Sequence, residues 1–150
     1  MLEPKKNYPA NDQAIGRSAG GLSTKIHATC DALGNPTGFH LTPGQAHDLD
    51  GFDALIDDID ADMLLADKAF DADERVRTIL EAKGCIAVIP PKKNRINPIA
   101  YDKDLYKARH LIENFFAKLK QYRAIATRYD KTSQNFLGGV YLAAIVIWLN

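Results

Sequence analysis

The chain has 150 residues, of which 46% are hydrophobic, and its 19 lysines and arginines balance 19 aspartates and glutamates. This length and apolar share suffice for one domain with a buried core and exclude intrinsic disorder, which goes with fewer apolar residues and a larger net charge. Two distant cysteines, Cys30 and Cys85, make neither a disulfide framework nor a zinc cluster and are expected as buried free thiols. No segment resembles a signal peptide or a membrane span, which predicts a soluble, cytoplasmic protein.

The balanced charge is unevenly distributed along the chain. Residues 31–74 include twelve acids and one base, whereas residues 92–131 include eleven bases and four acids. A basic segment favours binding of a polyanion, and an acidic segment with a few buried carboxylates favours a divalent metal. The alternative is that both segments form solvated faces that pair with each other.

The first third of the chain predicts an arm, a hairpin and a helix. Residues 1–21 lack periodicity and contain several prolines and glycines, so we expect a flexible arm. Alternation of apolar and polar residues predicts a strand over 22–30, and a turn leads to a second strand over 37–42. Apolar residues at helical spacing predict an amphipathic helix over 48–58.

The middle of the chain predicts two buried strands and a helix between them. The apolar runs 63–66 and 85–89 are typical of strands covered on both faces. A helix is expected over 71–83, with Gly84 ending it.

A basic loop follows from Lys92, and two helices complete the chain. They are predicted over 104–123 and 134–149. The order hairpin, helix, strand, helix, strand, helix, helix predicts one three-layer α/β domain over 22–150.

One polar stripe marks the predicted helix 104–123. At 100° per residue its four members fall within one arc of about 60° beside the apolar face. They are Tyr106, Arg109, Glu113 and Lys120. Such a stripe at the edge of a core can serve a site, and a row of salt bridges, with Arg109 pairing Glu113, explains the same spacing.

A single acid, Asp67, directly follows the predicted strand 63–66. The carboxyl ends of strands are where α/β sheets place their sites. The alternative is that Asp67 caps the following helix, although Asp71 is better placed for that role. Asp67 and Glu113 can face the same rim of the sheet, and two neighbouring carboxylates suit a hard cation such as Mg²⁺.

These two segments resemble a known family. The spacing Tyr106-x2-Arg109-x3-Glu113-x6-Lys120 resembles the Y-R-E-K signature of bacterial insertion-sequence DDE transposases. Asp67-Lys-Ala-Phe-Asp71 is similar to the family's second-aspartate segment, D-x-G-[YF]-D, with alanine where glycine is usual. Further similar segments lie at 16–25, 44–48, 89–91 and 128–131.

The resemblance implies a ribonuclease H-like three-layer fold and DNA transposition by phosphoryl transfer, with Mg²⁺ or Mn²⁺ as cofactor. Asp67 and Glu113 would be two of three catalytic, metal-binding carboxylates. DNA at the transposon ends would be contacted mainly through its backbone, with further affinity from the segment around Arg128 and Lys131. The expected DNA-binding residues are Tyr106, Arg109, Lys120, Lys92, Lys93 and Arg95.

The family's first catalytic aspartate has no counterpart here. It belongs on a strand upstream of the segment that matches 16–25, and neither Asp12 nor Asp31 suits the role. We therefore expect an N-terminally truncated ribonuclease H-like domain that lacks its first strand. Such a chain would be the C-terminal part or second-frame product of a transposase, and we expect that it does not cleave DNA alone. The alternative is a non-catalytic fragment that binds DNA or partner transposase chains, as a homo-oligomer or with an upstream-frame partner.

Overall fold

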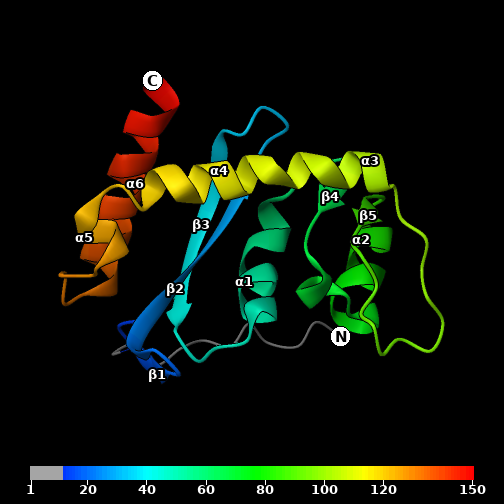
Figure 1. Ribbon diagram of the computed structural model, residues 1–150, viewed down its shortest axis with the longest axis horizontal. Coiled ribbons are helices and arrows are strands. Elements are labelled where there is room, and N and C mark those ends of the chain that lie inside the picture. The colour runs from blue at the N-terminus through cyan, green and yellow to red at the C-terminus, as the bar shows by residue number, and fades with distance from the viewer. Residues whose placement is uncertain (1–11) are drawn as a thin grey trace. The chain divides into compact units, whose positions relative to one another are not determined.

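The structure is a computed structural model that describes residues 12–150 and divides them into two compact units. The first unit contains residues 12–55 and 111–150, and the second contains residues 56–110. The chain enters the first unit, leaves it for the second, and returns to it through the long helical segment (Figure 1).

The first unit is built on an antiparallel sheet of three strands in the order β1–β2–β3. The hairpin predicted over 22–30 and 37–42 is confirmed as β2 (Gly21–Cys30) and β3 (Pro36–Pro43). The flexible arm predicted over 1–21 is wrong at β1 (Gly16–Ser18), because this segment pairs with the first residues of β2. Residues 1–11 of that expected arm lie outside the described residues.

Helices cover both faces of this sheet. On one face α1 (Asp48–Leu55) packs against β2 and β3, as its predicted amphipathic pattern requires. On the other face Phe39 of β3 contacts the ring of Phe115 in α4 (His110–Leu119), at 5.7 Å between centroids, and the edge of Tyr141. Within this unit, helices therefore lie on both faces of the sheet.

The core of the first unit lies between β3 and the C-terminal helices. The predicted last helix is confirmed as α6 (Ser133–Leu149), and α5 (Arg123–Ala126) packs beside it. Because the strand alternates, β3 sends every second side chain into this core. Its buried members are Ala14, Phe39, Leu41, Phe115, Leu119, Phe136, Val140, Ala143 and Ala144.

The helix predicted over 104–123 is interrupted in the structure. It begins as α3 (Lys103–Tyr106), tightens into a 3₁₀ turn over Lys107–Arg109, and continues as α4. The chain then turns at Tyr122, whose backbone is extended. A periodic pattern of apolar residues does not distinguish a 3₁₀ turn from α-helix, so this break was not visible in the sequence.

The second unit contains a parallel pair of strands joined by a helical connection. β4 (Met63–Leu65) pairs with β5 (Ile86–Val88), close to the predicted runs 63–66 and 85–89. Between them lie a 3₁₀ turn over Lys68–Phe70, a π-helical turn over Asp73–Arg77, and α2 (Thr78–Ala82).

Gly84 ends α2 as predicted from the sequence. It has φ +69°, and the amide of Cys85 donates to the carbonyl of Leu80 at 2.9 Å while that of Gly84 donates to Glu81 at 2.9 Å. These two bonds form a Schellman motif, which satisfies the last carbonyls of a helix and favours glycine at this position.

The expectation that both strands are covered on both faces is wrong at two positions. Val88 is 1% exposed, and Val76 and Leu80 of the same unit are also fully buried, but Met63 is 42% and Ile86 63% exposed. A short apolar run predicts a strand, but the burial of each face of that strand depends on the helices and loops that pack against it.

The two cysteines are free thiols, as expected, but only Cys85 is buried and Cys30 is half-buried. Burial raises the pKa of both thiols, and the nearby Asp31 and Asp62 carboxylates reinforce the rise. Within residues 12–150, no helix combines the length and apolar character that crossing a bilayer demands.

Candidate functional site

Asp67 lies at the carboxyl end of a parallel strand pair, where the sequence predicted a site. The segments that follow β4 and β5 leave the same edge of this small sheet because the strands are parallel. Together with Tyr106 and Arg109 they line a cavity of about 740 Å³ in the second unit. The lining residues are Asp67, Lys68, Ala69, Pro90, Lys92, Lys93, Asn94, Tyr106 and Arg109.

The Asp67 carboxylate has two different neighbours. One oxygen accepts a hydrogen bond of 2.8 Å from the amide of Ala69 and caps the 3₁₀ turn Lys68–Phe70. The other lies 3.7 Å from the guanidinium of Arg109. The side chain is 43% exposed, so solvent and ligands reach it. The sequence-based preference for Asp71 as the helix cap was wrong, because the helical segment that begins at Asp73 has Ala72 before it and no side-chain cap, while Asp67 caps the separate 3₁₀ turn.

Arg109 and Tyr106 line the cavity beside this carboxylate. The guanidinium lies over the Tyr106 ring at 5.8 Å from its centroid, within the range of a cation–π contact. The edge of Tyr101 packs against the same ring at 5.6 Å between centroids. Two residues of the predicted polar stripe therefore lie together in the cavity with Asp67.

Basic side chains outnumber acidic ones in the cavity. Lys68, Lys92, Lys93 and Arg109 line it against the single acid Asp67. An excess of cations at the carboxyl ends of strands favours an anionic ligand such as phosphate. Lys68 and Asn94 were not among the predicted site residues, and the signal that could have found Lys68 is its place directly after Asp67.

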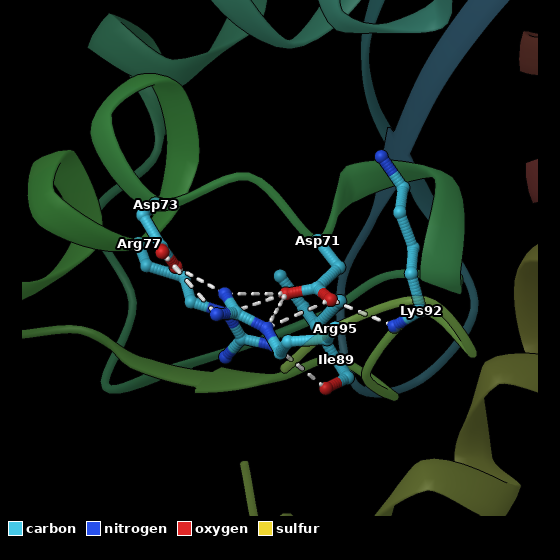
Figure 2. A network of polar contacts seen from close by, with 6 residues as sticks. All are labelled: Asp71, Asp73, Arg77, Ile89, Lys92 and Arg95. Atoms are coloured by element: carbon cyan, nitrogen blue, oxygen red, sulfur yellow. Dashed lines mark hydrogen bonds and ion pairs between the residues drawn. The ribbon is translucent and has the colours of Figure 1, made fainter. Parts of the chain in front are cut away.

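Asp71, at the end of the 3₁₀ turn that begins at Asp67, is the centre of a polar network (Figure 2). Its side chain is 1% exposed. It accepts hydrogen bonds from Arg77 Nε at 2.9 Å, from the amide of Lys92 at 2.7 Å, and from Arg95 at 3.1 Å. Burial acts to raise the pKa of Asp71, but these donors prevail and hold it below its usual range.

Arg95 connects the basic loop to the acidic segment. Its guanidinium also pairs with Asp73, and its side chain is 16% exposed. The acidic and basic segments therefore pair at this loop, as in the alternative stated above, but through largely buried side chains instead of solvated faces. Arg95 does not line the cavity as Lys92 and Lys93 do.

Glu113 and Lys120 belong to the first unit, where both are exposed at the α4 segment beside the buried Phe115 and Leu119. This placement agrees with a polar stripe at the edge of the core. Asp67 belongs to the second unit, so the convergence of Asp67 and Glu113 stays a prediction.

Carboxylates are the candidate metal ligands of this chain. Carboxylate oxygens suit a hard divalent cation, but residues 12–150 contain no group of three His, Cys, Asp or Glu side chains that would hold one. Asp67 and Glu113 belong to different units, so the ligand set implied by the resemblance stays a prediction.

Arg128 serves the first unit's own backbone. Its guanidinium donates to the carbonyls of Gln13 at 2.8 Å and Asp130 at 2.9 Å, and to Thr24 Oγ1 at 2.8 Å. It also lies over the Phe136 ring at 5.2 Å. This geometry makes Arg128 a structural residue, whereas the sequence suggested DNA backbone affinity around it.

Comparison with known proteins agrees with this arrangement. Two descriptions of the transposase DDE domain match the chain, over residues 4–97 and 64–150. The chain is also 40% identical, over 129 residues, to a Brucella ovis protein named "Putative transposase for insertion sequence element IS6501", covering 85% of this chain and 99% of that protein. No solved structure matches it. The strand-end aspartate, the basic cavity and these similarities lead to one conclusion: the chain belongs to the DDE transposase family of bacterial insertion sequences.

Proposed function

We propose that this chain acts in DNA transposition as the C-terminal part, or second-frame product, of a DDE transposase. The observation that carries the proposal is the basic cavity around Asp67, at the carboxyl ends of β4 and β5. In this reading, transposon-end DNA is the ligand, and it is held mainly through its phosphates.

The cavity suits a DNA phosphate because it combines lysine side chains with one guanidinium that has neighbours on both sides. Lys92 and Lys93 supply point charges from the loop after β5. Arg109 is oriented by Asp67 on one side and by the Tyr106 ring on the other, so its planar donors are preorganised. Lys120 and Arg95 are proposed to add contacts outside the cavity, and Tyr106 to stack near the reacting phosphate.

Asp67 and Glu113 are proposed as the two carboxylates of this chain that bind Mg²⁺, with Mn²⁺ as a substitute. DDE transposase domains generally use divalent metal ions, which in phosphoryl transfer activate the nucleophile and stabilise the leaving oxygen. The Asp67 side chain is 43% exposed, which leaves it accessible to a metal ion. If the assignment holds, an experimental structure places the two carboxylates within about 10 Å of each other, since direct metal–oxygen bonds are about 2.0–2.6 Å.

The chain by itself is proposed not to cleave DNA. In this proposal the chain supplies two of three carboxylate ligands, and phosphoryl transfer depends almost entirely on positioning and charge stabilisation, so an absent ligand leaves the metal ions poorly placed. A chain with two of the three carboxylates also fits the second candidate function, a non-catalytic fragment that binds DNA or joins partner transposase chains.

A nicking assay with Mg²⁺ or Mn²⁺ separates these possibilities. We expect no cleavage by the purified chain, and cleavage once an upstream segment carrying a strand that ends in aspartate is fused to it. Loss of that activity in Glu113→Gln and Asp67→Asn would support their assignment. Cleavage by the unfused chain that disappears in Glu113→Gln would contradict the split-enzyme proposal.

DNA binding is tested by its dependence on salt. If about five phosphates are neutralised, the log–log slope of affinity against salt is about −4 to −5 for duplex DNA. Lys92→Gln with Lys93→Gln should reduce the slope by about 2, because each neutralised phosphate contributes about 0.9. Lys83→Gln, an exposed lysine beyond α2, is the matched control. Binding that is insensitive to salt would overturn the phosphate assignment.

A further inference from the structure

We propose that Asp71 is a positioning residue of this site, whose carboxylate ties the loop 90–95 to the turn carrying Asp67 and so holds Lys92 and Lys93 in the cavity. The inference rests on the proposed function, because it assigns a role to the loop that would bind DNA phosphates. Asp71 itself does not line the cavity.

Asp71 connects two of the chain segments that line the cavity, 67–69 and 90–94. The 3₁₀ turn Lys68–Phe70 has Asp67 at its first end and Asp71 at its last, where the amide of Asp71 donates to the carbonyl of Lys68 at 3.2 Å. From the last end the carboxylate accepts the amide of Lys92 at 2.7 Å, in the loop after β5 (Figure 2). A single side chain thus connects the segment of Asp67 to the segment of the two lysines.

Two arginines make this link rigid. Arg77 donates to Asp71 and, through its other end, to the carbonyl of Ile89 at 3.0 Å, which fixes the end of β5. Arg95 donates to both oxygens of Asp71 and to Asp73. The loop is therefore held at Ile89, Lys92 and Arg95.

The charges of the network explain why the carboxylate is needed. Asp71 is 1% exposed, while Arg77 and Arg95 are 13% and 16% exposed. Removing the carboxylate charge leaves two poorly solvated guanidinium groups close together without their shared counter-ion. The loop is then expected to move away to solvate Arg95, taking Lys92 and Lys93 with it.

For Asp71→Asn, this proposal and simple electrostatics predict opposite changes in DNA affinity. Asp71→Asn removes a negative charge, which by long-range attraction alone strengthens binding to DNA. If Asp71 positions the loop, the same variant weakens binding instead, by about eightfold at 0.1 M salt for each phosphate that is no longer neutralised, and the salt slope falls by about 0.9 for each such phosphate. Glu81→Gln removes the same charge from an exposed position on α2 and should bind as tightly as the wild-type chain or more tightly.

Local and global effects are separated by amide hydrogen exchange in the same samples. Asp71→Asn should speed exchange at the Lys92 amide at least tenfold while the Leu80 amide, in the buried core of α2, is unchanged. Val76→Ala, which trims a fully buried side chain of the same unit, controls for general destabilisation and should keep its DNA affinity. If Asp71→Asn does not fold, Arg77→Lys tests the same link, because it keeps the charge and removes the paired hydrogen bonds to Asp71 and Ile89.

The outcomes distinguish this inference from the proposed function. Weaker DNA binding by Asp71→Asn or Arg77→Lys, with faster exchange confined to the loop, supports positioning. Binding like that of Glu81→Gln, or an unchanged Lys92 amide, overturns it. If the double substitution of Lys92 and Lys93 leaves DNA binding unchanged, the proposed function of the cavity fails, while the exchange data still decide whether Asp71 holds the loop.

Discussion

Replacing Arg128 tests whether this residue holds the first unit together or contacts DNA. Arg128→Met keeps much of the apolar stem and removes every donor. The guanidinium makes bonds to the backbone carbonyls of Gln13, Asp130 and Lys131 and to the hydroxyl of Thr24. The residue is half-buried, and burial lowers the pKa of Arg128 while Asp130 opposes that effect.

The size of the effect follows from these interactions. A hydrogen bond to a charged group contributes about 1.5–3 kcal/mol to stability. The bonds of Arg128 share one guanidinium, which is partly exposed to solvent, so their contributions do not add fully. The contact with the Phe136 ring contributes about 0.5–1 kcal/mol at such a site. We expect a total loss of about 2–4 kcal/mol, out of the roughly 5–15 kcal/mol typical of a domain.

Thermal unfolding followed by circular dichroism measures this loss. At about 2–4 °C per kcal/mol for a protein of this size, Tm should fall by roughly 4–16 °C. Arg128→Lys, which keeps the charge and removes the fork of donors, should lower Tm by a smaller amount. Arg123→Met, an exposed arginine of α5, is the control and should leave Tm nearly unchanged. An unchanged Tm for Arg128→Met with weaker DNA binding would refute the structural role.

Three further predictions concern stability within each unit. Gly51→Ala should lower the free energy of unfolding, measured in urea, by about 1–3 kcal/mol. The new Cβ would lie 2.1 Å from Nδ1 of His27 and displace a ring that forms a hydrogen bond of 2.7 Å with Thr42 Oγ1. Unchanged stability would show that the ring moves freely. Burial, helped by the nearby His40, lowers the pKa of His27 from 6.5 to about 4. The unfolded chain therefore binds the proton first, and the free energy of unfolding should fall by at most about 3 kcal/mol as the pH drops from about 6.5 to 4. A His27→Gln variant with the same pH profile would contradict this prediction. Gly84→Ala should cost about 1 kcal/mol, because alanine is strained at φ +69°, and a stabilised variant would exclude the Schellman geometry at the end of α2.

Local patterns in the sequence determined most of the helices and strands and the position of one candidate site residue, Asp67. Alternation over 22–30 and 37–42 depends only on neighbouring residues, so the hairpin was predictable, as were α1 and α6. The position of Asp67 was predictable for the same reason, because an acid that directly follows an apolar strand must lie at its carboxyl end. The spacing of the Y-R-E-K residues carried the family, which the comparisons confirmed.

The tertiary structure alone decided which partners the charged side chains chose. Asp71 was predicted as a helix cap, yet its partners Lys92 and Arg95 lie 21 and 24 residues further along the chain. Arg128 was expected near DNA, yet it binds the carbonyl of Gln13 from 115 residues away. A hydrogen bond depends on the direction and burial of both groups, and folding fixes these only when distant segments pack, so no local pattern contains them. The sequence therefore indicated where the candidate site lies along the chain, and packing determined which charged side chains line the cavity and which bind other parts of the protein.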